Sequence, residues 1–118
     1  MAKKRITILG STGSIGKNAL DVIRKNREYF EVVGLACNEN IDLFQSQIKE
    51  FNPKIAAVCS EKAGKTLLKK IKLNLLYGEE GVNEIVKSFN TDLVLVAIVG
   101  LQALLPAYNA LSTTKILA

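Results

Sequence analysis

The sequence predicts an α/β domain built on a doubly wound, mostly parallel sheet with helices on both faces. Three observations lead to this fold class. Short apolar runs alternate along the chain with stretches in which apolar residues recur at helical spacing. The run Leu93–Ala97 is apolar at every position, as is typical of a strand covered on both faces. The 118 residues, 48% of them hydrophobic, are enough for one domain with a single core.

The first half of the chain predicts three strands separated by two helices. The strands are expected at Arg5–Leu9, Phe30–Ala36 and Ile55–Cys59. The helices are indicated by apolar stripes, Ile15, Ala19, Val22 and Ile23 in the first and Ile41, Phe44, Ile48 and Phe51 in the second. The first helix is expected to end near Asn26, while Asn40 is the expected N-cap of the second and Pro53 closes it.

The second half continues the alternation. Further strands are expected at Leu73–Tyr77, at Leu93–Ala97 and from Lys115 to Ala118. Helices are indicated by the stripes Ala63, Leu67, Leu68 and Ile71, then Val82, Ile85, Val86 and Phe89, and finally by the segment Leu101–Leu111. Ser60 is the expected N-cap of the first of these, and Gly78 is expected to end the strand after it. Because no capping helix or polar tail follows Ala118, we expect the sheet to belong to a larger architecture.

A glycine-rich turn lies between the first predicted strand and the first predicted helix. Its sequence is Gly10-Ser11-Thr12-Gly13-Ser14-Ile15-Gly16. Gly10 permits a tight turn, Gly13 lets the backbone approach a pyrophosphate, and Gly16 lets the helix pack closely on the sheet. Backbone amides, the helix dipole and the hydroxyl groups of the turn would all favour an anion. The turn therefore predicts the phosphate cradle of a Rossmann-type nucleotide- or dinucleotide-binding domain, the alternative being an ordinary turn whose glycines serve only backbone geometry.

Two more segments are expected at the same edge of the sheet. Asn38, Glu39 and Asn40 follow the second strand, where the adenosine ribose of a dinucleotide would lie. The strand end is uncharged but Glu39 follows shortly after it, so the choice between NAD and NADP stays open; equally, the three residues could be a polar loop that caps the next helix. Ala97-Ile98-Val99-Gly100 ends the strand expected to be the most buried, and its small residues would allow a nicotinamide ring to lie against the backbone, although a plain strand end needs similar residues.

Composition excludes several classes of function. The longest nearly apolar run, Leu93–Leu105, contains Gln102 and is shorter than the roughly 18 residues of a membrane span. No signal peptide is indicated at Lys3–Arg5, so we expect a cytoplasmic protein. A net charge of +5 with 6% aromatic residues and no Trp does not indicate a nucleic-acid partner. Cys37 and Cys59 are expected to be free thiols. Since the chain has no His and no carboxylate cluster, it predicts no catalytic residue and no metal ligand.

Five segments occur in a characteristic order: Ile6–Gly16, Asn52-Pro53-Lys54, Ala97–Gly100, Leu104-Leu105-Pro106 and Lys115–Ala118. In this combination the chain resembles the N-terminal cofactor domain of 1-deoxy-D-xylulose 5-phosphate reductoisomerases over its whole length. The resemblance implies one NADPH-binding domain over residues 1–118, without the family's metal- and substrate-binding and C-terminal domains. It also implies a divalent metal, Mg or Mn, with ligands outside this chain, and a homodimeric parent enzyme.

The resemblance implies a reaction and a set of contacts. Enzymes of this family isomerise and reduce 1-deoxy-D-xylulose 5-phosphate to 2-C-methyl-D-erythritol 4-phosphate in non-mevalonate isoprenoid synthesis. By resemblance, residues 12–15 contact the cofactor phosphates, residues 38–40 meet the adenosine 2′-phosphate and residues 97–100 approach the nicotinamide. Many members carry Gly and often a basic residue where this chain has Asn38 and Glu39.

Because the family's metal ligands and substrate-phosphate residues follow the equivalent of Ala118, this chain is expected to be catalytically inactive by itself. It is expected to bind NADPH weakly, because the resemblance implies that half of the nicotinamide pocket is missing. Two alternatives remain at this point. One is another NADP-dependent enzyme, such as an aldehyde oxidoreductase, and the other is a non-catalytic nucleotide-sensing module.

Overall fold

The computed structural model of the chain describes residues 3–88, 91–97 and 116–117. The strands in these ranges are β1 (Lys4–Leu9), β2 (Phe30–Cys37), β3 (Ile55–Val58), β4 (Leu75–Tyr77), β5 (Leu93–Val96) and β6 (Ile116–Leu117). The helices are α1 (Ser14–Arg24), α2 (Ile41–Phe51), α3 (Glu61–Leu68) and α4 (Gly78–Ser88). The predicted alternation of strands and helices is confirmed, and the helix predicted over 101–111 lies outside the described residues.

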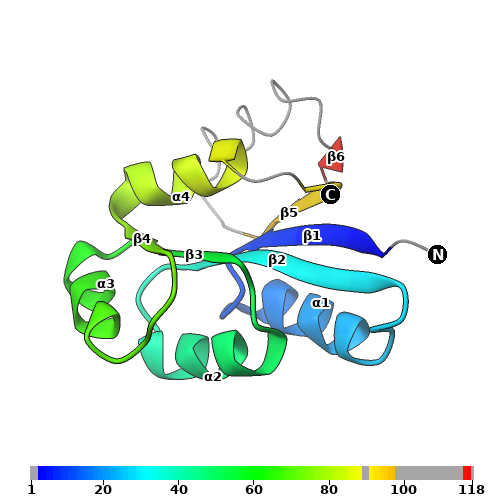
Figure 1. The fold of residues 1–118 in the computed structure, drawn as a ribbon, viewed down its shortest axis with the longest axis horizontal. Helices are drawn as coiled ribbons and strands as arrows, with labels where there is room; N and C mark the ends of the chain where they lie inside the picture. Colours follow the sequence, from blue (N-terminus) through cyan, green and yellow to red (C-terminus); the bar gives the residue numbers. More distant parts are fainter. Residues whose placement is uncertain (1–2, 89–90, 98–115, 118) are drawn as a thin grey trace.

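The strands form one sheet in the order β4-β3-β2-β1-β5-β6, and every described strand pair is parallel. The chain starts in the interior of the sheet, runs outward from β1 to β4 and then crosses back to add β5 on the other side of β1 (Figure 1). This confirms the doubly wound arrangement. In such sheets the winding direction changes between two strands, here β1 and β5, and ligands bind beyond the carboxyl ends of those strands.

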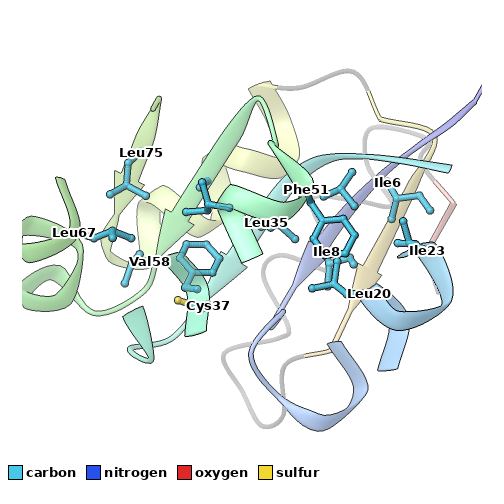
Figure 2. Close-up of a cluster of buried hydrophobic side chains, with 14 residues drawn as sticks. Ile6, Ile8, Leu20, Ile23, Leu35, Cys37, Phe51, Val58, Leu67 and Leu75 are labelled. Carbon is cyan, nitrogen blue, oxygen red and sulfur yellow. The ribbon is translucent and has the colours of Figure 1, made fainter. Parts of the chain in front are cut away.

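Helices cover both faces of the sheet, as predicted. Helices α1, α2 and α3 lie on one face, and α4 lies on the other (Figure 1). Between the sheet and the first three helices, 14 buried side chains form an apolar cluster that we call the α1–α3 cluster. Figure 2 shows its side chains from α1 and the sheet, among them Leu20, Ile23, Ile6 and Ile8. A second group of eight buried residues packs beneath α4 and is called the α4 cluster.

The strand that is buried at every position is β3 rather than β5. The expectation that the run ending at Ala97 would be the most buried strand was therefore wrong. Successive side chains of β3 point to opposite faces, and each face is filled: Ala56 belongs to the α1–α3 cluster and Ala57 to the α4 cluster. In β5 only Val94 is fully buried, and the other three residues are half-buried.

The helix ends agree with the sequence pattern except at α4. The Asn40 Oδ1 accepts a hydrogen bond from the Leu43 N–H at 3.4 Å, and the Ser60 Oγ accepts one from the Ala63 N–H at 3.2 Å, so both predicted N-caps are confirmed. Helix α4 begins at Gly78, directly after β4 and one turn before the predicted stripe. The sequence pattern missed this turn because residues 78–81 include no apolar side chain to mark a buried face.

Candidate functional site

Backbone hydrogen bonds bring the predicted site segments together at the carboxyl edge of the sheet. The N–H groups of Gly10 and Ser11 both donate to the carbonyl oxygen of Ala36, at 2.8 and 2.9 Å. On the other side of β1, the N–H of Ala97 donates to the carbonyl oxygen of Leu9 at 2.7 Å. The turn, the end of β2 and the end of β5 therefore meet at the point where the winding direction changes. The predicted site residues Ile98, Val99 and Gly100 lie outside the described residues.

Two of the turn's glycines are required by its own geometry. Gly10 adopts a φ of +93°, in the left-handed region that favours glycine. A Cβ at Gly16 would lie 2.1 Å from the Gly10 carbonyl oxygen, so only glycine allows the first turn of α1 to pack this closely. At Gly13 the same oxygen would lie 3.6 Å from a Cβ, an ordinary contact. Gly13 is also exposed, so the turn itself leaves the space beside Gly13 open to a ligand.

The N-terminus of α1 differs from those of α2 and α3. Its N-cap residue, Gly13, makes no side-chain hydrogen bond to the helix, and the first turn has no acidic residue. By contrast, α2 has the cap Asn40 and an acid in its first turn, and α3 has the cap Ser60 and an acid there as well. The first amides of α1 therefore have no side-chain acceptor from a cap, and the positive end of the helix is not neutralised by a nearby carboxylate. This arrangement suits an anion.

The loop after β2 is positioned by β3. The Cys59 N–H donates to the Cys37 carbonyl oxygen at 2.8 Å, and the Ser60 N–H donates to the Asn38 carbonyl oxygen at 2.9 Å, which extends the pairing beyond the ends of both strands. The side chain of Asn40 caps α2. Asn38 and Glu39 are exposed beside the turn's edge of the sheet. The capping alternative is thus confirmed for Asn40, while the other two side chains are available to a ligand.

Gln47 is a site-adjacent residue that the sequence analysis missed. It lies on α2 and is only 6% exposed, and its Nε2 donates to the carbonyl oxygen of Ser11 at 2.8 Å. Ser11 itself is completely buried. A signal was present in the sequence, because Gln47 follows Phe44 by three residues and so falls on the apolar stripe of the helix. A polar side chain at such a core position needs a buried partner.

The two cysteines at this edge are free thiols, as predicted. Cys37 belongs to the α1–α3 cluster and Cys59 packs against the α4 cluster, so their side chains lie on opposite faces of the sheet. Burial, with a smaller contribution from Cys59, raises the pKa of Cys37 to about 12. Burial and the nearby Glu79 carboxylate raise the pKa of Cys59 as well. Both thiols are therefore poor nucleophiles at neutral pH.

Within residues 3–88, 91–97 and 116–117, no group of three or more His, Cys, Asp or Glu side chains is placed to hold a metal ion. No helix in the part of the chain that the structure describes has the length and apolar character needed to cross a membrane.

Comparison with known sequences gives one family. The family model described as 1-deoxy-D-xylulose 5-phosphate reductoisomerase matches residues 6–118. A reductoisomerase from Thermodesulfovibrio yellowstonii is 48% identical over 113 residues, which is 95% of this chain and 30% of that protein. One from Thermoanaerobacter sp. is 46% identical over 117 residues, 98% of this chain and again 30% of the relative. The chain thus spans about a third of the length of the curated relatives it matches.

Solved structures give the same result. The reductoisomerase from Zymomonas mobilis, solved in complex with NADPH, superposes with a TM-score of 0.92 at 26% identity, covering 99% of this chain and 31% of that one. Another reductoisomerase, solved with NADPH, fosmidomycin and magnesium, gives a TM-score of 0.91 at 28% identity, covering 97% of this chain and 29% of that one. Since the family model spans nearly the entire sequence and the fold agrees, the chain belongs to the 1-deoxy-D-xylulose 5-phosphate reductoisomerase family.

Proposed function

We propose that residues 1–118 form one NADPH-binding domain, and that this domain serves an enzyme that isomerises and reduces 1-deoxy-D-xylulose 5-phosphate to 2-C-methyl-D-erythritol 4-phosphate. The observation that carries the proposal is the N-terminus of α1, which has no side-chain cap and no acid in its first turn, beside an exposed Gly13. A pyrophosphate fits this place because backbone amides and the helix dipole favour an anion there. The relatives solved with NADPH support the choice of cofactor.

The residues of the turn have separate roles in this proposal. Gly10 and Gly16 shape the turn, and Ser11, predicted from the sequence to contact the cofactor, is instead completely buried with its N–H bonded to the Ala36 carbonyl oxygen. The backbone amides of Thr12, Gly13, Ser14 and Ile15 and the hydroxyl groups of Thr12 and Ser14 are assigned to the phosphates. The side chain of Ile15 is 60% exposed, so it offers an apolar surface beside the same amides. The chain's contribution here is to bind and orient the cofactor, which supplies a hydride when bound.

Two further segments complete the proposed site. Asn38, Glu39 and Asn40 are assigned to the adenosine 2′-phosphate, with Asn40 acting through its cap on α2. Ala97, held to Leu9 by a backbone hydrogen bond, begins the segment 97–100 that we assign to the nicotinamide. The two segments lie at the ends of β2 and β5, on either side of the turn at the end of β1. An extended dinucleotide bound across the turn would meet both of them.

The metal, the substrate chemistry and the assembly of the whole enzyme are proposed to depend on other parts of the protein. The described residues do not provide a ligand set for a divalent metal, so we assign none of them to magnesium or manganese. Substrate chemistry and assembly into a homodimer are proposed for the whole protein. We propose the cytoplasm as its compartment, because two unpaired cysteines suit a reducing environment.

Calorimetric titration of the chain with NADPH and NADH tests the proposal. We expect binding of NADPH by the wild type, weakened at least about tenfold by Gly13→Val because the new side chain would occupy the place of the pyrophosphate. The turn itself tolerates a Cβ at this position, so the variant should remain folded. Asn18→Val is the matched control, since it adds the same side chain at an exposed position further along α1.

The control should bind NADPH within about twofold of the wild type. A folded wild type that binds neither nucleotide would overturn the cofactor assignment. Undiminished binding by Gly13→Val would overturn the assignment of the phosphates to this turn.

A further inference from the structure

We propose that Gln47 is a positioning residue of the cofactor site: its side-chain amide holds Ser11 in place, so that the exposed amides after Ser11 face the cofactor's pyrophosphate. The proposal rests on the NADPH binding proposed above and adds a residue to it from an element outside the glycine-rich turn. Gln47 is 36 residues from Ser11 in sequence, and the contact between them depends on the packing of α2 against the sheet.

The first half of the turn is held by two different elements. From β2, the carbonyl oxygen of Ala36 accepts the N–H groups of Gly10 and Ser11. From α2, Gln47 donates to the carbonyl oxygen of Ser11 at 2.8 Å. The second half of the turn has a different environment, because Gly13 and Ser14 are exposed. The hydrogen bonds therefore position the buried half, and the exposed half is left to bind.

The Gln47 contact is difficult to replace. Ser11 is completely buried and Gln47 is 6% exposed, so bulk water does not reach the contact. A carbonyl oxygen can only accept hydrogen bonds, which requires the NH₂ group of the Gln47 amide to face it. Among the residues that the structure describes, Gln47 is the one shown donating to this oxygen. Without it, the Ser11 peptide would be free to turn toward another donor and would take the next amide of the turn with it.

Helix α2 also links the two halves of the proposed site. At its start, Asn40 caps the helix and ends the loop assigned to the 2′-phosphate. Two turns later, Gln47 holds the turn assigned to the pyrophosphate. Phe44, fully buried in the α1–α3 cluster, anchors the helix between them. One rigid helix therefore sets the position of the pyrophosphate turn relative to the adenosine loop.

Replacing Gln47 by methionine tests the proposal. Gln47→Met keeps the length of the side chain but removes the donor, and Gln45→Met makes the same change at a half-buried position on the same helix. We expect the Gln47 variant to bind NADPH about fivefold to tenfold more weakly than the wild type, since one hydrogen bond is lost. The affinity of Gln47→Met for adenosine 2′-monophosphate, which has no pyrophosphate, should stay within about twofold of the wild-type value. Gln45→Met should bind both ligands with wild-type affinity.

If Gln47 had a purely structural role, Gln47→Met would weaken the binding of NADPH and of adenosine 2′-monophosphate equally. That result would overturn the proposal. Unchanged NADPH binding by Gln47→Met would overturn it too. In either case binding of NADPH by the wild type would still support the proposed function, whereas a folded wild type that does not bind NADPH would remove the proposed function itself.

Two further measurements apply if the methionine variant does not fold. In Gln47→Glu a carboxylate faces the Ser11 carbonyl at neutral pH, but the protonated acid can donate to it. Burial raises the pKa of a Glu side chain above its ordinary value of about 4.3, so more of the new carboxyl group is protonated at pH 5 than at pH 8. The ratio of variant to wild-type dissociation constants for NADP⁺ should therefore fall as the pH is lowered from 8 to 5. In the wild type, the Gln47 side-chain NMR signals should shift on titration with NADPH while those of Gln45 do not. A flat ratio, or unshifted Gln47 signals, would overturn the proposal.

Discussion

The Cβ that a side chain would add at Gly16 lies 2.1 Å from the carbonyl oxygen of Gly10 and 2.7 Å from the Cα of Ser11. Both contacts are with backbone atoms, which no change of rotamer can move away. The first turn of α1 therefore rests directly on the start of the glycine-rich turn. This contact explains why two glycines six residues apart are needed together. Gly10 turns the chain at a positive φ, and Gly16 leaves room for the Gly10 carbonyl oxygen.

Gly16→Ala is expected to destabilise the fold by at least about 3 kcal/mol, since the backbone of the turn must move to admit one methyl group. Gly13→Ala is the matched control, because its Cβ meets the Gly10 oxygen at an ordinary distance of 3.6 Å. The free energy of unfolding of Gly13→Ala should fall by about 1 kcal/mol or less. Urea unfolding measures both changes, and equal midpoints for the two variants would contradict the predicted clash.

A second prediction concerns the ion pair between Arg5 and Asp92, which joins β1 to the segment before β5. The Asp92 carboxylate accepts from the Arg5 backbone N–H at 2.8 Å and from its Nη2 at 3.2 Å. The hydrogen bonds from the Arg5 side chain and backbone lower the pKa of Asp92 below its ordinary value. This interaction therefore stabilises the fold fully above the unfolded-state pKa, about 3.9, and is lost as the pH falls through the lower folded-state pKa.

Asp92→Asn should accordingly be less stable than the wild type at pH 7, and the difference should disappear as the pH falls below about 4. Urea unfolding at several pH values measures this difference. Glu28→Gln removes a charge at an exposed position and should show no such trend. A stability difference that persists unchanged to pH 2 would show that the charge of Asp92 is not its cause.

A third prediction concerns the thiols. With its pKa raised to about 12 by burial, Cys37 has roughly a thousandfold less thiolate at pH 8 than an ordinary cysteine. Cys59 is half-buried and should react first with a thiol reagent in the native chain. Cys37 should react only after unfolding, so native Cys59→Ser should be almost inert and become reactive in denaturant. Mass spectrometry locates the label, and equal labelling of both native cysteines would contradict the burial of Cys37.

Local patterns in the sequence predicted most of the fold because they record which face of most elements is buried. The stripe predicted for α1 was wrong in part, since Ile15 and Val22 are exposed and the buried face is formed by Gly16, Leu20 and Ile23. The caps Asn40 and Ser60 were identified from residue type and position alone. The start of α4 was missed because its first turn carries no apolar residue. The relative burial of β3 and β5 could not be predicted either, since it depends on the helices that cover each strand and on the position of the strand in the sheet.

The site was predicted in part for the same reason. The glycine-rich turn is a local motif, and the structure places it at the end of β1, where the winding direction changes. The contact between Gln47 and Ser11 joins residues 36 positions apart, so no local period reveals it. An amide on the apolar stripe of α2 indicated a buried partner but not which one. The roles of residues 97–100 at the nicotinamide stay a prediction.

The last prediction concerns the choice between NADPH and NADH. Glu39 is exposed in the loop assigned to the adenosine 2′-phosphate, where its carboxylate would repel a group that only NADPH carries. Glu39→Lys should therefore raise the ratio of NADPH to NADH affinity by about threefold to tenfold, a modest change because solvent screens exposed charges. High salt should reduce the gain. Glu28→Lys makes the same change of charge in the segment between α1 and β2, and should leave the ratio unaltered. If titration calorimetry gives the same ratio for wild type and Glu39→Lys, the Glu39 side chain does not face the ribose.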